Sequence, residues 1–171
     1  MPELRIHLVK DKDGSVLLRC HRRDGTVTWQ RNDRGRGNFF VVHDLTHYAV
    51  ETVLAHRRGF WGLVADGWNV TDFGAPWPRG PMPADMDPSE LIVGFFDGER
   101  AGGVTWTAAD FNDKAEKYFA SHGAKKTLTL RDRELDAIRT LVQDLISRWM
   151  LLPRGATLEL PFDRAAFAQA V

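Results

Sequence analysis

The fold of this chain is decided near its N-terminus, where Leu4–Gln30 reads LRIHLVKDKDGSVLLRCHRRDGTVTWQ. Apolar and polar residues alternate in its first run, residues 4–9, as expected of a strand with one buried face. Two further runs cover residues 15–21 and 26–30. Asp-Gly dipeptides at 13–14 and 24–25 separate the three runs, and Asp-Gly readily adopts the positive φ that tight hairpin turns require. The segment therefore predicts a three-stranded antiparallel meander.

Beyond the meander the apolar spacing becomes helical. Helices are predicted over 41–57, 60–67, a short segment from Ser89, 108–122 and 131–151. The clearest is 131–151, where apolar residues recur at intervals of three and four: Leu135, Ile138, Val142, Leu145 and Trp149. Between residues 68 and 88, five of the eight prolines exclude a regular helix or central strand.

A fourth strand is predicted at Thr157–Leu160, and it can join the N-terminal sheet. We therefore expect an α+β fold, in which an N-terminal antiparallel β-meander and a C-terminal strand pack against several α-helices. The length of 171 residues fits a single domain spanning residues 1–171.

Composition narrows the classes of partner. Lys plus Arg and Asp plus Glu both number 23, so the net charge is zero and no nucleic-acid partner is expected. No window approaches the roughly 18 consecutive apolar residues of a membrane span, so no membrane association is expected. The N-terminus lacks the basic and then apolar run of a secretory signal. The single cysteine, Cys20, is expected to be a small core residue. These features predict a cytoplasmic protein.

The residues that point to chemistry lie in the predicted helix over 41–57. His43, His47 and Glu51 are spaced at i, i+4 and i+8, so they follow one face of a helix. Two neutral imidazoles one turn apart can bind a transition metal, and Asp44 beside them can act as a general acid or base. We therefore predict His43 and His47 as ligands of a divalent metal, zinc above all, with Asp44 as the catalytic residue.

The segment His43-Asp44-Leu45-Thr46-His47 resembles the His-Glu-x-x-His helix of zinc metallopeptidases. The resemblance covers five residues, and it implies a metal-dependent hydrolase in which Asp44 takes the place of the general-base glutamate. Aspartate is one methylene shorter, which puts peptidase chemistry itself in doubt. The His-Asp pair is also similar to that of HD-type metal-dependent phosphohydrolases, whose domain is all helical.

A third ligand is harder to assign. Glu51 lies two turns from His43, roughly 12 Å along the axis, so it is expected either as a further ligand near His47 or as an orienting partner. Asp66, or Asp72 after it, can fold back to complete the site. Residues 68–74 carry side chains suited to the wall of a pocket.

A structural alternative stays open for the same residues. His47 can be a hydrogen-bonded core histidine, and Asp44 suits the first turn of a helix. The protein is then a non-catalytic binding or interaction module with a small-molecule or protein partner. The cluster of Trp61, Trp68 and Trp77 fits either a binding surface or a core that covers the proline-rich segment.

Overall fold

The computed structural model describes residues 1–33 and 35–169. Its elements, in chain order, are β1 (Leu4–Lys10), β2 (Val16–Arg22), β3 (Val27–Asn32), α1 (Gly37–Val53), α2 (Phe60–Ala65), the 3₁₀ helix η1 (Val70–Phe73), α3 (Ser89–Gly102), α4 (Ala108–Ser121), α5 (Asp132–Leu151), β4 (Thr157–Phe162) and the 3₁₀ helix η2 (Ala166–Gln169).

The four strands form one antiparallel sheet in the order β3-β2-β1-β4. Leu8 of β1 pairs with Leu18 on one side and with Leu158 on the other. Gly14 and Gly25 have φ angles of 88° and 87°, as the two Asp-Gly turns require. The predicted meander and its C-terminal fourth strand are confirmed, and with them the α+β class.

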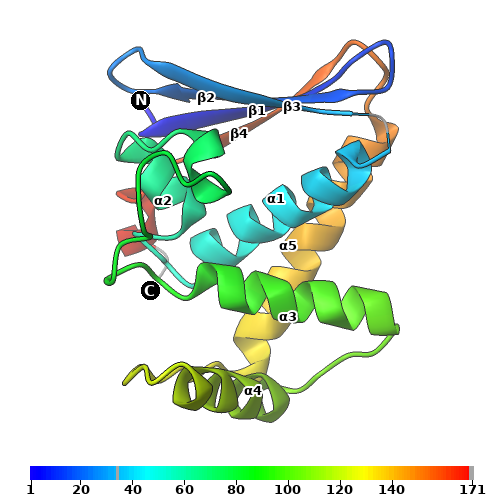
Figure 1. Ribbon diagram of the computed structural model, residues 1–171. Helices are drawn as coiled ribbons and strands as arrows, with labels where there is room; N and C mark the ends of the chain where they lie inside the picture. The colour runs from blue at the N-terminus through cyan, green and yellow to red at the C-terminus, as the bar shows by residue number, and fades with distance from the viewer. Residues whose placement is uncertain (34, 170–171) are drawn as a thin grey trace.

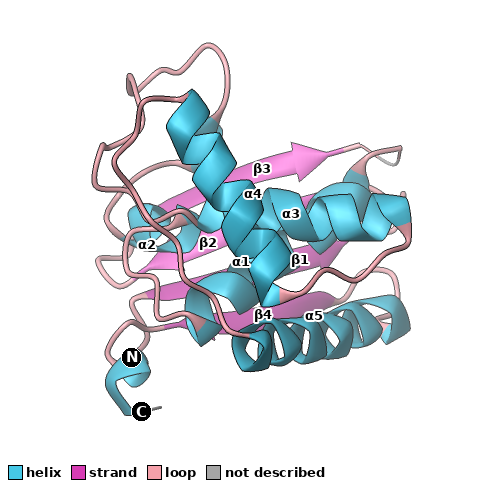
Figure 2. Cartoon of the chain, turned by 90° about the horizontal axis from the view of Figure 1, so that it is seen from below, coloured by secondary structure: helices cyan, strands magenta, loops and turns pink. Residues whose placement is uncertain are grey.

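All of the long helices lie on one face of this sheet (Figures 1 and 2). Alternate strand residues, among them Leu4, Ile6 and Leu8, point toward the helices and are at most 1% exposed. Helices α1 and α5 contribute both to the apolar cluster beneath the sheet and to a second cluster shared with α3 and α4. Helix α1 therefore lies in the middle of the molecule, between the sheet and α3.

The helix boundaries differ most from the predictions in two places. Helix α1 begins at Gly37 and ends at Val53, four residues earlier at each end than the predicted 41–57. It ends there because Ala55 adopts a left-handed φ of 54° and the His56 N–H then bonds to Glu51 O instead of continuing the helical pattern. The segment expected to be short from Ser89 is a helix of 14 residues. This added length matters because α3 carries two carboxylates to the site.

Two further observations concern the single cysteine and the expected absence of a membrane span. Cys20 is fully buried in the apolar cluster beneath the sheet, which confirms it as a core residue, and burial raises the pKa of its thiol. Among residues 1–33 and 35–169, no helix combines the length and the apolar character needed to cross a lipid bilayer.

Candidate metal centre

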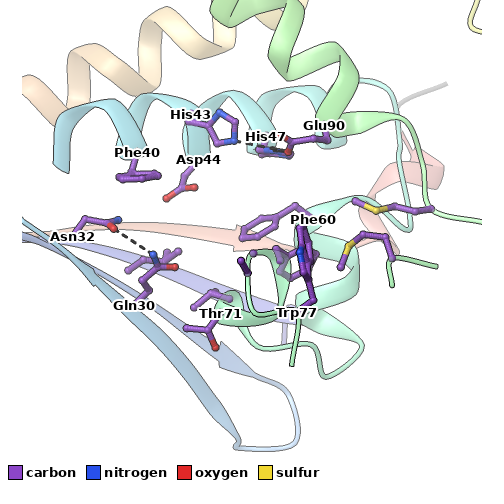
Figure 3. Close-up of a pocket in the computed structure, with 17 residues that line it drawn as sticks. Gln30, Asn32, Phe40, His43, Asp44, His47, Phe60, Thr71, Trp77 and Glu90 are labelled. Atoms are coloured by element: carbon purple, nitrogen blue, oxygen red, sulfur yellow. Dashed lines mark hydrogen bonds and ion pairs between the residues drawn. The ribbon is translucent and has the colours of Figure 1, made fainter. Parts of the chain in front are cut away.

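The two predicted histidines lie side by side on α1, with ring centroids 4.9 Å apart. Their spacing of four residues places both on the helix face that meets α3 and that faces the η1 segment across a cavity (Figure 3). His47 is 1% exposed, whereas the side chain of His43 is 23% exposed. The pair therefore lies at the boundary between the core and solvent, where an ion can enter.

Glu90, in the first turn of α3, brings a carboxylate to this pair. Its Oε2 lies 2.8 Å from His47 Nε2 and 3.9 Å from His43 Nε2. The three side chains each offer a ligand atom within 4.8 Å of the others. In tetrahedral zinc sites with bonds of about 2.0–2.1 Å, neighbouring ligand atoms are about 3.3 Å apart, so modest side-chain movements fit these three atoms to one ion.

The opposite ring nitrogen of each histidine meets a different carboxylate. His43 Nδ1 lies 2.9 Å from Asp97 Oδ2, and Asp97 is itself paired with Arg100. His47 Nδ1 lies 3.3 Å from Glu51 Oε1. A carboxylate on Nδ1 fixes the ring orientation and leaves Nε2 free to bind a metal. Both imidazoles thus direct Nε2 toward the same oxygen of Glu90.

Glu51 is held in place by the start of α2. Its Oε2 accepts hydrogen bonds from the Trp61 and Gly62 backbone N–H groups, at 3.0 and 3.3 Å. The side chain is fully buried, and Gly59 passes so close that a Cβ there would overlap the Glu51 carboxyl group. Of the two roles considered for Glu51, the structure favours the orienting partner of His47 over the direct ligand.

Asp66 is not brought to the imidazoles. Its carboxylate lies 2.8 Å from Arg164 Nη2 and 3.7 Å from Arg58 Nη1, so two guanidinium groups occupy it. Asp72, the alternative, accepts the Asn69 backbone N–H at 2.7 Å in the capping box of η1. Glu90 takes the place that the sequence suggested for Asp66.

Sequence reasoning missed both Glu90 and Asp97. Glu90 lies 43 residues beyond His47, and Asp97 lies 54 residues beyond His43. One signal was available: the two acids are seven residues apart in α3, two turns, and therefore share a helix face. Nothing along the chain indicates that this face packs against the histidines of α1.

Burial and neighbouring charges raise the pKa of two groups at this site. Burial raises the pKa of Asp44 to about 7, against the attraction of His43 and His47. Burial of His47 opposes its charge, but hydrogen bonds to Glu51 and Glu90 outweigh this effect and raise the pKa of its imidazole to about 9. Asp44 is 9% exposed and lines a cavity beside the two imidazoles. A carboxyl group with this pKa can exchange a proton near neutral pH.

The cavity has a volume of about 560 Å³ and lies between α1, β3 and the segment from η1 to Met86. This volume falls in the usual range for small-molecule sites, roughly 300–1,000 Å³. Figure 3 shows Asp44 pointing into it from α1, with Gln30 and Asn32 of β3 on the opposite wall. Residues 70, 71, 73 and 74 line it, so the expected pocket wall in residues 68–74 is confirmed. Trp61 and Trp68 are buried, whereas Trp77 is 49% exposed at this cavity.

Comparison with protein-family models, curated proteins and solved structures found no match for this chain. The class of site is therefore defined by geometry alone. It is a candidate mononuclear metal centre with two imidazoles and one carboxylate, open to a small-molecule cavity of an α+β fold.

Proposed function

We propose that this protein is a cytoplasmic metal-dependent hydrolase that binds one divalent ion through His43, His47 and Glu90. The observation that carries the proposal is the convergence of both Nε2 atoms on one Glu90 oxygen, while each Nδ1 lies against a carboxylate of its own. A donor set of two nitrogens and one oxygen suits zinc, and three protein ligands leave a position for water or substrate.

An ion held by His43, His47 and Glu90 would supply Lewis acidity and would make a nearby water more acidic. Asp44 would accept a proton from the attacking water as the water oxygen forms a bond with a substrate carbonyl carbon and the carbonyl π bond opens. The same carboxyl group then donates the proton to the leaving oxygen or nitrogen as the bond to carbon breaks. The position of Asp44 on the cavity wall, directly after His43 in the chain, supports this role.

Metal analysis tests the proposal directly. Protein incubated with zinc and then desalted is expected to retain one zinc per chain, and Glu90→Ala is expected to lose it. The Glu90 side chain is 67% exposed, so Glu90→Ala is expected to keep the wild-type circular dichroism spectrum. Glu116→Ala, which changes an exposed glutamate on α4, is the matched control and is expected to keep the zinc.

Activity gives the second readout. Chelator-sensitive hydrolysis by wild-type protein, absent from Glu90→Ala and present in Glu116→Ala, is the expected pattern. Failure to retain zinc, manganese or nickel in stoichiometric amounts refutes the metal-dependent enzyme.

One observation favours a second candidate, a non-catalytic binding module. His47 lies between the buried Glu51 and the exposed Glu90, and these three groups satisfy one another as a partly buried ion-pair network. In that case His47→Ala leaves Glu51 buried without its charge partner, at a cost of about 3–5 kcal/mol in unfolding free energy. Thermal melts separate the candidates. A chelator that leaves the wild-type melt unchanged, with a much lower melt for His47→Ala in both conditions, supports the binding module.

A further inference from the structure

The cavity beside the candidate metal centre has walls of two chemical kinds. Most of its surface is apolar and includes the aromatic rings of Phe40, Phe60, Phe73 and Trp77 together with Met82 and Met86. The aromatic side chains also contact one another: Phe60 and Phe73 have ring centroids 4.5 Å apart. A ligand that fills this space gains stability by removing its own apolar surface from water.

The second kind of wall is uncharged but polar. Gln30 and Asn32 of β3 line the cavity, and Gln30 Nε2 donates a hydrogen bond to Asn32 Oδ1 at 3.3 Å. Thr71 of η1 adds a hydroxyl group on the same side (Figure 3). Amide and hydroxyl groups both donate and accept hydrogen bonds. They can therefore orient a neutral carbonyl or amide group without a charge on either partner.

The ionic groups at the imidazoles are predominantly acidic. Asp44 and Glu90 line the cavity, while Glu51 and Asp97 lie directly behind the two histidines. A divalent ion offsets two of these four carboxylates, and Arg100 pairs with Asp97. Among the cavity-lining residues that the structure describes, none is lysine or arginine. A phosphate ester would add its own negative charge to this group, and like charges at close range repel one another.

From these walls and charges we infer that the site acts on uncharged apolar esters or amides, and that it discriminates against phosphate esters and other anions. This inference rests on the proposed metal-dependent hydrolase and adds its substrate class. The aromatic side chains hold an apolar group of the substrate, Gln30 and Asn32 orient its polar group, and Asp44 together with Glu90 disfavours anions.

Three metal-binding probes test the inference on zinc-loaded protein. Benzohydroxamate carries the aromatic ring, acetohydroxamate lacks it, and phenylphosphonate carries the ring on a strongly anionic group. Calorimetric titration is expected to show benzohydroxamate binding at least tenfold more tightly than either of the other two. Tighter binding of phenylphosphonate than of benzohydroxamate overturns the inference.

Each probe also has its own affinity for zinc. Two variants separate the effect of the cavity walls from that affinity, because each probe is compared between wild type and variant. Asp44→Asn is expected to strengthen phenylphosphonate binding about tenfold relative to acetohydroxamate binding, because the more highly charged phosphonate is repelled more strongly by the Asp44 carboxylate. Trp77→Ala is expected to weaken benzohydroxamate about fivefold and to leave acetohydroxamate unchanged. Trp77 is 49% exposed, so this variant tests the aromatic wall without removing a core side chain.

The outcomes separate this inference from the proposed function. The protein can retain zinc and yet fail to show the expected order of probe affinities, or fail to show both variant effects. In either case the substrate class is wrong and the metal centre stands. If zinc itself is not retained, the proposed metal-dependent hydrolase fails first, and the inference falls with it.

Discussion

Glu51 Oε1 lies 3.3 Å from His47 Nδ1, and neither side chain is more than 2% exposed. The second oxygen of Glu51 accepts the backbone N–H groups of Trp61 and Gly62. One buried carboxylate therefore joins the imidazole of α1 to the start of α2. The orientation of His47 therefore depends on the position of the first turn of α2, which begins directly after residue 59.

Glu51→Gln is expected to weaken zinc binding about 10–100-fold, the usual effect of changing a group that orients a metal ligand. The amide oxygen of glutamine can still accept hydrogen bonds from the start of α2, but its NH₂ group cannot accept the imidazole N–H. Competition with a zinc-binding dye measures the affinity. Unchanged affinity in a correctly folded variant contradicts the orienting role of Glu51.

Gly59→Ala is expected to lower the free energy of unfolding by about 1–3 kcal/mol, the usual cost of overpacking. A Cβ at this position overlaps the Glu51 carboxyl group and the Ser89 hydroxyl, and both are buried. Gly94→Ala is the matched control, because a Cβ at Gly94, on the exposed side of α3, meets nothing within 4 Å. That change is expected to stabilise the protein by up to about 1 kcal/mol through helix propensity. Urea denaturation of the two variants measures the sign of each change in the free energy of unfolding. Equal changes in the two variants argue against the close packing around Glu51.

Zinc binding is expected to strengthen as pH rises. Hydrogen bonds to Glu51 and Glu90 raise the pKa of His47 to about 9 against the opposing effect of burial, so the metal-free imidazole is protonated at neutral pH. Zinc must displace that proton. The association constant is therefore expected to increase about tenfold per pH unit between pH 6 and 8 and to level off near pH 9. Calorimetry in buffers of different ionisation enthalpy counts the released protons, and a count of zero at pH 7.5 rejects this assignment.

Asp44→Asn is expected to reduce hydrolysis by about 10²–10⁴-fold, the usual contribution of general acid–base catalysis, and to leave zinc stoichiometry at one per chain. Asparagine keeps the shape of the side chain but cannot exchange the proton. Paired measurements of kcat and bound zinc, on an uncharged ester that the wild type hydrolyses, make the comparison. Full activity in a zinc-loaded Asp44→Asn protein removes Asp44 from the mechanism.

Much of the fold follows from patterns between neighbours in the chain. The Asp-Gly turns, the alternation in β1 and the apolar spacing of α5 each involve residues a few positions apart, so they are readable before any tertiary contact forms. The limits of α1 are different. Its end depends on the left-handed conformation of Ala55, which leads the chain toward Gly59 and its contact with Glu51.

The sequence by itself determined that His43, Asp44 and His47 lie within two consecutive turns of one helix and that Glu51 follows on the side of the histidines, because helical periodicity dictates this placement. Only the tertiary structure decided which acids meet them. Packing of α3 against α1 brings Glu90 and Asp97 to the imidazoles, while Arg164 and Arg58 engage Asp66. Three of these pairings, His47–Glu90, His43–Asp97 and Asp66–Arg164, join residues more than 40 positions apart. Such contacts depend on the burial of whole helix faces, which no local pattern in the chain encodes.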